Sequence, residues 1–247
     1  MDKQFDAQAL HDWACSLAGE YLPDGWQHVS SSPYTRVAVN AELGLYYKEF
    51  LPRSPAETFK GWLRGSRATR ARNNGDALAR AGFGAPQNVF WGRLPGGGEY
   101  LYTRRAAGET LTQWLRDTHG RDSLAQRRAL LRALGVFIGR LHATGFVHGD
   151  LRPGNVLAHA HDGRFSFTLL DNERNRRLRP PPGRMLQRNL MQLNMLEHST
   201  LGCTDRMRFF RAWHSQMREF DDIEGKIIAA GAYRWAMRRL RDKGYRR

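Results

Sequence analysis

The chain has 247 residues with 41% hydrophobic content, which is enough for one large domain or two small lobes around a buried core. No stretch approaches the roughly 20 apolar residues that span a bilayer, and the N-terminus lacks the basic and apolar regions of a signal peptide. The two cysteines, Cys15 and Cys203, have no metal-like spacing, so we expect reduced thiols and a cytoplasmic protein.

The formal net charge of +15 predicts an anionic partner. A nucleic acid, an acidic membrane surface and a phosphorylated substrate all fit this charge, and so does a solvated basic surface without a specific partner. Charge alone does not choose among these classes.

The first 50 residues predict one helix followed by β-structure. Apolar residues at helical spacing place an amphipathic helix over residues 5–18. Residues 25–50 predict strands, and Lys48 lies in the last of them, LYYKEF. The first hairpin loop, SSSPYT, contains Ser31 and Ser32, whose hydroxyls could hold a phosphate. An ordinary polar turn is equally consistent with this loop.

A helix and a second hairpin follow. Ser54–Glu57 has the pattern of a capping box, so we expect a helix to begin near Pro55. The pair Gly65-Ser66 interrupts it, and a basic helix then runs to about Ala81. Residues 84–105 predict a hairpin whose turn is the PGGG sequence.

The rest of the chain is predicted to be mainly helical. A short helix covers residues 110–118, and a capping box at Ser123–Gln126 opens a long helix that ends at Gly145. A third hairpin turns at His161–Gly163. Two or three further helices are expected at about 184–198, 204–217 and 219–243, the last marked by Phe220, Ile223 and Ile227.

The motif HGDLRPGN, His148–Asn155, is the strongest functional signal. Asp171 follows sixteen residues after Asn155, beyond the third hairpin. Protein kinases carry an aspartate, an asparagine five residues later and a second aspartate after a hairpin as the acid set for phosphoryl transfer. Loop residues at strand ends can converge on one cleft. The alternative is that Asp150 and Asn155 cap a turn and that Asp171 ends a strand.

Two strongly basic segments follow this motif. Arg174–Arg188 contains six arginines, three consecutive prolines and no acid, and it lies where protein kinases keep the activation and substrate segment. Arg234–Arg247 contains seven basic residues and one acid. Each segment fits either an anionic partner or a solvated surface.

Four stretches together resemble the lipopolysaccharide core kinase family, the WaaP/InaA/Kdo-kinase group. They are YYKEF, SRATRARNNGDALARAGFGAP, HGDLRPGN and LLDNER, and the resemblance covers roughly residues 30–175. It implies an α+β, bilobal, protein-kinase-like fold. A small β-rich N-lobe would comprise residues 1–103, and a mainly helical C-lobe residues 104–247. HGDLxPxN alone is shared with aminoglycoside and choline phosphotransferases.

The resemblance also implies the roles of five residues and two cofactors, ATP and Mg²⁺. Asp150 would be the catalytic base, and Arg152 would stabilise charge on the transferring phosphoryl oxygens. Asn155 and Asp171 would bind Mg²⁺, and Lys48 would bind the nucleotide phosphates. His148 is interpreted as a scaffold of the loop.

Further nucleotide contacts are predicted less directly. The serines of the first hairpin loop stand where kinases have a glycine-rich loop, which this chain lacks. The helix before Ala81 lacks the glutamate that pairs with the strand lysine, and Asn74, or less favourably Asp76, is its nearest substitute. The lobe hinge, which includes Thr103 and Arg105, would bind adenine through its backbone groups.

The resemblance implies a heptose or Kdo hydroxyl of the lipopolysaccharide core as acceptor. The protein would then lie at the cytoplasmic face of the inner membrane of a Gram-negative bacterium, with its basic segments on anionic lipid. No oligomeric state is predicted.

Three alternatives remain open. A kinase for an aminoglycoside- or choline-type substrate would need an acidic cleft for a cation, whereas the segment after Asp171 is basic. A pseudokinase is consistent with the missing glutamate and glycine-rich loop. A nucleic-acid binder fits the charge, but the sequence carries no recognisable reading motif, so no nucleic-acid partner is expected.

Overall fold

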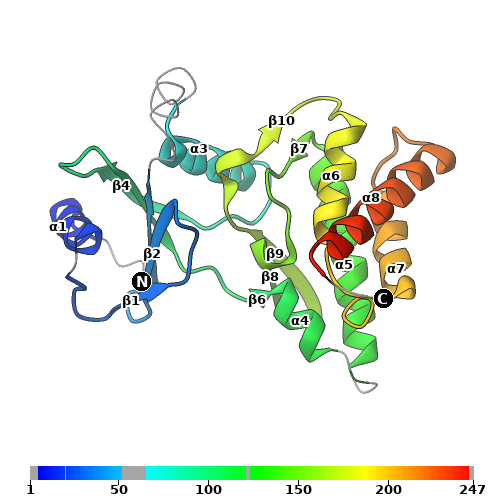
Figure 1. Cartoon of the computed structure of the whole chain (residues 1–247), viewed down its shortest axis with the longest axis horizontal. Coiled ribbons are helices and arrows are strands. Elements are labelled where there is room, and N and C mark those ends of the chain that lie inside the picture. The colour runs from blue at the N-terminus through cyan, green and yellow to red at the C-terminus, as the bar shows by residue number, and fades with distance from the viewer. Residues whose placement is uncertain (1–4, 20, 52–64, 119, 121–122, 245–247) are drawn as a thin grey trace. The chain divides into compact units, whose positions relative to one another are not determined.

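The computed structural model describes residues 5–19, 21–51, 65–118, 120 and 123–244 (Figure 1). The chain divides into two compact units, Met1–Ala106 and Ala107–Arg247. Within the described ranges, no helix combines the length and the apolar content needed to cross a membrane.

The first unit is built on a five-stranded antiparallel sheet with the strand order β1-β2-β3-β5-β4. The predicted helix at the N-terminus and the first two hairpins are confirmed. The elements are α1 (Ala7–Ala18), β1 (Trp26–Val29), β2 (Thr35–Asn40), β3 (Leu45–Phe50), α3 (Arg67–Arg80), β4 (Asn88–Arg93) and β5 (Glu99–Arg104).

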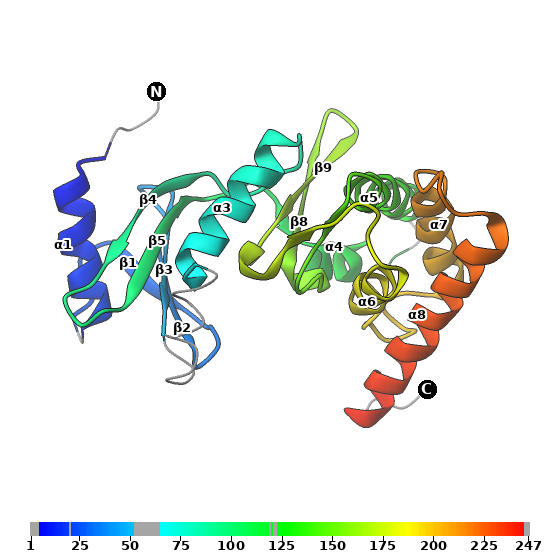
Figure 2. The same cartoon turned by 90° about the horizontal axis from the view of Figure 1, so that it is seen from above.

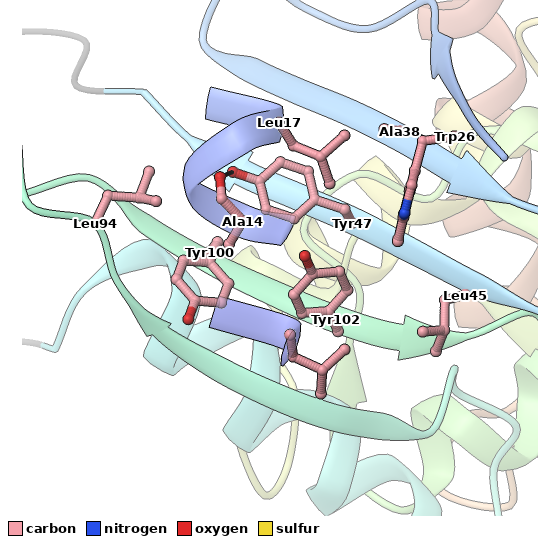
Figure 3. Packing of buried hydrophobic residues seen from close by; sticks show 10 residues of the cluster. Ala14, Leu17, Trp26, Ala38, Leu45, Tyr47, Leu94, Tyr100 and Tyr102 are labelled. Atoms are coloured by element: carbon pink, nitrogen blue, oxygen red, sulfur yellow. Dashed lines mark hydrogen bonds between the residues drawn. The ribbon is translucent and has the colours of Figure 1, made fainter. Parts of the chain in front are cut away.

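Three buried tyrosines form the centre of the sheet's first face. Tyr47, Tyr100 and Tyr102 pack against the apolar side of α1, as Figure 3 shows. The hydroxyl of Tyr47 donates to the carbonyl of Ala14, and that of Tyr100 bonds His11 Nδ1 at 2.8 Å. Burial raises the pKa of Tyr47 and of Tyr102, so these hydroxyls stay protonated.

Helix α3 covers the other face of the sheet. Its Ala68 packs on Phe50 of β3 and on Leu101 of β5. The helix begins where predicted, because the side chain of Ser66 accepts a hydrogen bond from the backbone of Thr69 at 3.0 Å. The helix predicted to begin near Pro55 lies outside the described residues.

The second unit is mainly helical, as predicted. Its strands form a three-stranded sheet of order β6-β8-β9 and a separate β10-β7 pair. The helices α5 and α7 lie side by side in Figure 2. The elements are β6 (Glu109–Thr110), α4 (Leu111–Asp117), α5 (Leu124–Ala143), β7 (Phe146–Val147), β8 (Val156–His161), β9 (Arg164–Leu169), β10 (Arg176–Arg177), α6 (Gly183–Leu193), α7 (Cys203–His214) and α8 (Asp222–Asp242).

Glycines allow the close approach of α5 and α7. A Cβ atom on Gly139 would lie 2.6 Å from the carbonyl oxygen of Trp213, and one on Gly135 would meet the carbonyl of Phe209. Gly145, with φ of 89°, ends α5 as predicted. The predicted third hairpin is also present, with positive φ at Asp162 and Gly163 in its turn.

Three predictions for this unit were inaccurate. The capping box at Ser123 is not formed, because the backbone there is not extended and the hydroxyl donates to the carbonyl of Gly120 instead. Helix α6 ends at Leu193, about five residues early. Helix α8 begins after Asp221, which forms a capping box with Glu224, so Phe220 precedes it.

Candidate active site

The loop His148–Asn155 links β7 to β8 and is anchored by its histidine. The backbone N–H of Asp150 donates to His148 Nδ1 at 3.1 Å, so the ring proton is on Nε2, which lies 2.9 Å from the carbonyl of Leu170. Burial lowers the pKa of His148. A neutral ring with both nitrogens bonded is a scaffold rather than a proton carrier, which agrees with its interpretation from sequence.

Asp150 is held on one carboxylate oxygen. Its Oδ1 accepts a hydrogen bond from Arg152 Nε at 2.8 Å and another from Gln192 Nε2 at 3.1 Å. The side chain of Asp150 is 22% exposed, whereas that of Arg152 is 66% exposed. The carboxylate is therefore oriented by the protein and still accessible.

Asn155 and Asp171 are brought together by the β8–β9 hairpin. The side-chain amide of Asn155 donates to the backbone carbonyl of Asp150 at 2.9 Å, and the backbone carbonyl of Asn155 accepts from the backbone N–H of Leu170 at 2.9 Å. Asp171 follows directly with a left-handed backbone, φ 59° and ψ 53°. Such a conformation is uncommon for a residue with a Cβ and is enriched at functional sites.

These donors fit a Mg²⁺ ion. Magnesium is usually bound by one or two carboxylates together with substrate phosphates and water, rather than by a complete protein cage. One carboxylate and one amide oxygen on adjacent backbones provide such a partial set. Among the described residues, no group of three or more His, Cys, Asp or Glu side chains could hold a metal ion.

The predicted nucleotide residues belong to the first unit. Lys48 lies on β3 opposite Leu101, and its Nζ is 5.1 Å from the centroid of the Phe50 ring. Adjacent strand residues point to opposite faces, so Lys48 and Phe50 share the α3 side of the sheet, away from Tyr47. Asn74 lies on α3 itself. The other substitute, Asp76, accepts a hydrogen bond from Asn88 at 2.7 Å.

The hairpin loop and the predicted hinge are partly engaged in internal hydrogen bonds. Ser31 Oγ donates to the carbonyl of Thr35 at 2.7 Å, and Ser32 Oγ bonds the hydroxyl of Thr35 at 2.9 Å. The loop is thus a polar turn, and phosphate binding there remains a prediction. Thr103 of β5 lies opposite Tyr46 of β3, and the backbone N–H of Arg105 donates to the carbonyl of Gly44 at 2.8 Å. Adenine binding at Arg105 would need a different backbone group.

The segment after Asp171 packs directly on the loop. The backbone N–H of Gly149 donates to the side chain of Asn175 at 3.2 Å, and a Cβ at Gly149 would collide with Arg174. Strand β10 then pairs with β7, so that Arg176 lies opposite Val147 and Arg177 opposite Phe146. Two exposed arginines therefore lie opposite the two strand residues that directly precede the loop His148–Asn155.

Sequence reasoning missed two site residues, Asn189 and Gln192 of α6. Asn189 accepts from the backbone N–H of His148 at 3.0 Å and donates to its carbonyl at 2.6 Å. The Oε1 of Gln192 accepts from the backbone of Leu151 at 3.1 Å. Both side chains are buried. The only signal in the sequence was a pair of amides three residues apart in an otherwise apolar helix face.

His142 holds the side chain of Asn189 in place by a hydrogen bond. Trp213 Nε1 donates to His142 Nδ1 at 3.0 Å, which leaves the ring proton on Nε2, 3.2 Å from Asn189 Oδ1. Burial lowers the pKa of His142 from 6.5 to about 4. The neutral ring therefore connects α5, α6 and α7.

This buried histidine predicts loss of stability in acid. Below pH 6.5 the unfolded chain gains a proton that folded His142 does not take up until about pH 4, so the free energy of unfolding falls across this interval. The expected loss from this group at pH 5 is ~2 kcal/mol. Urea unfolding at pH 7 and pH 5 measures it. His142→Gln, which keeps one donor and one acceptor, is expected to lose less stability between pH 7 and pH 5. An equal loss in wild type and His142→Gln would show that His142 is not the group responsible.

Comparison with known proteins gives one family match and several structural matches. A sequence model described as the lipopolysaccharide kinase (Kdo/WaaP) family matches residues 41–213. No curated protein matches the chain. Solved structures of WbdD match 85% of the chain at 18% identity. A complex with the kinase inhibitor LY294002 and a high-resolution crystal structure each have a TM-score of 0.50, and the chain covers 45% of each.

A third structure, described as the bifunctional kinase-methyltransferase WbdD, has a TM-score of 0.48 at 18% identity, with 85% of this chain and 46% of that chain covered. The chain thus spans about half the length of these proteins. At this identity the likeness concerns the fold alone. It confirms the predicted fold class, a β-rich first part and a mainly helical second part.

Proposed function

The chain belongs to the lipopolysaccharide kinase (Kdo/WaaP) family, and on this premise we propose that it transfers the γ-phosphate of ATP to a heptose or Kdo hydroxyl of the lipopolysaccharide inner core. The main support within the chain is the loop His148–Asn155. This loop holds Asp150 in a fixed orientation and ties Asn155 to the strand that ends before Asp171.

In the proposed reaction Asp150 takes the proton of the acceptor hydroxyl while the hydroxyl oxygen bonds to the γ-phosphorus. The bond from the γ-phosphorus to the bridging oxygen breaks, and its electron pair leaves with ADP. Arg152, two residues later in the loop and largely exposed, offers its cation to the transferring phosphoryl oxygens. Lys48 of the first unit is assigned to the other nucleotide phosphates.

Asn155 and Asp171 are proposed to hold Mg²⁺, which neutralises charge on the phosphates when it is bound. The protein's part is to present the two oxygen donors together. Asn155 does so because its amide nitrogen is occupied by the carbonyl of Asp150, which directs Oδ1 away from that bond.

The charge of the segment after Asp171 favours an anionic acceptor over a cationic one. Arg176 and Arg177 are exposed on β10 beside the strand that leads into the loop. Arginines bind phosphate and carboxylate groups well, and Kdo carries a carboxylate. An aminoglycoside or choline, each a cation, would be repelled by these side chains.

The test is transfer of labelled γ-phosphate to three acceptors. They are lipopolysaccharide from a strain that lacks this protein, an aminoglycoside, and choline, each with Mg²⁺ and after chelation. We expect label in the lipopolysaccharide alone and none without the metal ion. Label in the aminoglycoside or in choline would show that the protein is a small-molecule kinase instead. Thermal stabilisation by Mg-ATP without any transfer would support a pseudokinase.

We further propose that the protein meets its acceptor on an anionic lipid surface, at the cytoplasmic face of the inner membrane. Helix α8 presents one continuous exposed stripe, in which Ile223 and Ile227 are 68% and 62% exposed. Arg234, Arg238 and Arg241 continue the same stripe at helical spacing and are also exposed. The opposite side of α8 is buried through Ala232, Ala236 and Leu240. Apolar and basic residues on one exposed stripe are typical of helices that lie in a membrane interface.

Removing two of these charges is expected to weaken vesicle binding about 30-fold. Each basic residue near an anionic surface contributes about 1 kcal/mol, so Arg234→Gln with Arg238→Gln removes about 2 kcal/mol. Co-sedimentation with phosphatidylglycerol vesicles measures the change. Arg128→Gln with Arg132→Gln on α5 is the matched control, since it removes equal charge from another exposed surface of the same unit. Equal weakening by both pairs would contradict docking through α8.

A further inference from the structure

We propose that Gln192 is a positioning residue that fixes Asp150 from behind and leaves Oδ2 of Asp150 as the oxygen that takes the proton. This inference deepens the proposed function and rests on the role of Asp150 as base. Gln192 lies on α6, well separated in sequence from the loop that it contacts.

The amide of Gln192 bridges the side chain of Asp150 and the backbone of the next residue. The backbone N–H of Leu151 can only donate, so it bonds Gln192 Oε1, at 3.1 Å. The amide nitrogen must then face the carboxylate, and Nε2 lies 3.1 Å from Asp150 Oδ1. Rotating the amide by half a turn would place Nε2 against the N–H of Leu151 and Oε1 against the carboxylate of Asp150, so neither hydrogen bond could form. One side chain therefore fixes both the carboxylate and the backbone that carries it.

Gln192 is itself held rigidly. It is 6% exposed, and the side chain of Asn189, one turn earlier on α6, lies 3.4 Å from its Oε1. Asn189 is bonded in turn to His142 and to both backbone groups of His148. The amide of Gln192 thus belongs to a buried network that extends across three helices. Such networks are rigid when every member is satisfied.

The two oxygens of Asp150 consequently differ. Arg152 and Gln192 both donate to Oδ1, and no hydrogen bond to Oδ2 is found among the residues that the structure describes. Arg152 is a mostly exposed side chain and pays a large entropy cost to stay in place. The buried amide is the better-ordered of the two donors. Oδ2 is therefore the oxygen directed to the acceptor hydroxyl.

The test is Gln192→Met, which keeps the length of the side chain and removes both hydrogen bonds. We expect kcat, normalised to nucleotide-binding sites, to fall about 10- to 100-fold, while the KM for ATP changes by less than about twofold. In the Asp150→Asn background the same substitution is expected to cost less than about twofold, because the base is already absent. Gln187→Met, on the same helix but against Gly231 of α8, is the matched control and should retain kcat.

Amide hydrogen exchange supplies a readout that needs no acceptor. Loss of the Leu151 bond should accelerate exchange in peptides that cover the loop His148–Asn155, in Gln192→Met but not in Gln187→Met. Each of three results would overturn the proposal. They are unchanged exchange in Gln192→Met, unchanged kcat in Gln192→Met, and an equal fold-loss of kcat from this substitution in the wild-type and Asp150→Asn backgrounds. If the wild type transfers no phosphate to lipopolysaccharide, the proposed function fails, and the exchange result alone still decides whether Gln192 positions the loop.

Discussion

Replacing Asp150 with Asn is expected to lower kcat for phosphate transfer by about 10²- to 10⁴-fold, the usual contribution of a general base. Both donors to this side chain, Arg152 and Gln192, reach Oδ1. Asparagine can keep its Oδ1 in the same place, so the loop should retain its conformation. At the Oδ2 position it presents an NH₂ group, which cannot accept a proton. The substitution therefore removes the base while preserving the contacts that hold it.

Binding of Mg-ATP, measured by titration, should remain within about threefold of wild type, because Asp150 is assigned to the acceptor rather than to the nucleotide. Asp162→Asn is the matched control. Asp162 lies at the tip of the β8–β9 hairpin, its side chain is 84% exposed, and asparagine tolerates its positive φ. Retained transfer in Asp150→Asn would show that the base lies elsewhere, and loss of transfer in Asp162→Asn would show that the effect is not specific to Asp150.

Replacing Arg127 with Met is expected to destabilise the protein by about 3 kcal/mol, because it leaves a buried carboxylate without its main partner. Arg127 is 5% exposed, and its Nε lies 2.9 Å from Asp205 Oδ2. The same guanidinium donates to the carbonyls of Leu115 at 2.8 Å and Thr200 at 2.5 Å. One side chain thus ties α4, α5 and the start of α7 together.

Urea unfolding measures this loss as a lower midpoint at unchanged slope. Arg128→Met, one residue away and exposed, is expected to change stability by less than about 0.5 kcal/mol. Adding Asp205→Leu to Arg127→Met should recover much of the loss, since it removes the carboxylate that has lost its main partner and keeps only the contact with Arg208. Equal stability of Arg127→Met and wild type would mean that this ion pair contributes nothing net.

The elements of the fold were largely predictable because their signals are local. Hydrophobic period, turn residues and helix caps act over a few residues, and they located α1, α3, α5 and the three hairpins. The capping box at Ser123 failed because capping depends on the φ and ψ angles of the cap residue, and composition does not give them. The spacing of Ile223 and Ile227 predicted a helix but not which side of it would be covered.

The candidate site was predictable only where its residues follow one another closely. The spacing from Asp150 through Asn155 to Asp171 crosses one hairpin, and the hairpin register places the last two together. Asn189 and Gln192 were not predictable, because polar residues on a helix usually face solvent. Here they face inward, and only the packing of α6 against the loop gives them partners.

The most direct test of the central claim is ³¹P NMR of lipopolysaccharide core from a strain that lacks this protein, complemented with wild type or with Asp150→Asn. The account predicts that wild type restores a phosphate monoester on an inner-core sugar and that Asp150→Asn, at equal protein level, does not. The same phosphate signals with both proteins, or no difference from the uncomplemented strain with wild type, would contradict a lipopolysaccharide kinase that uses Asp150 as its base.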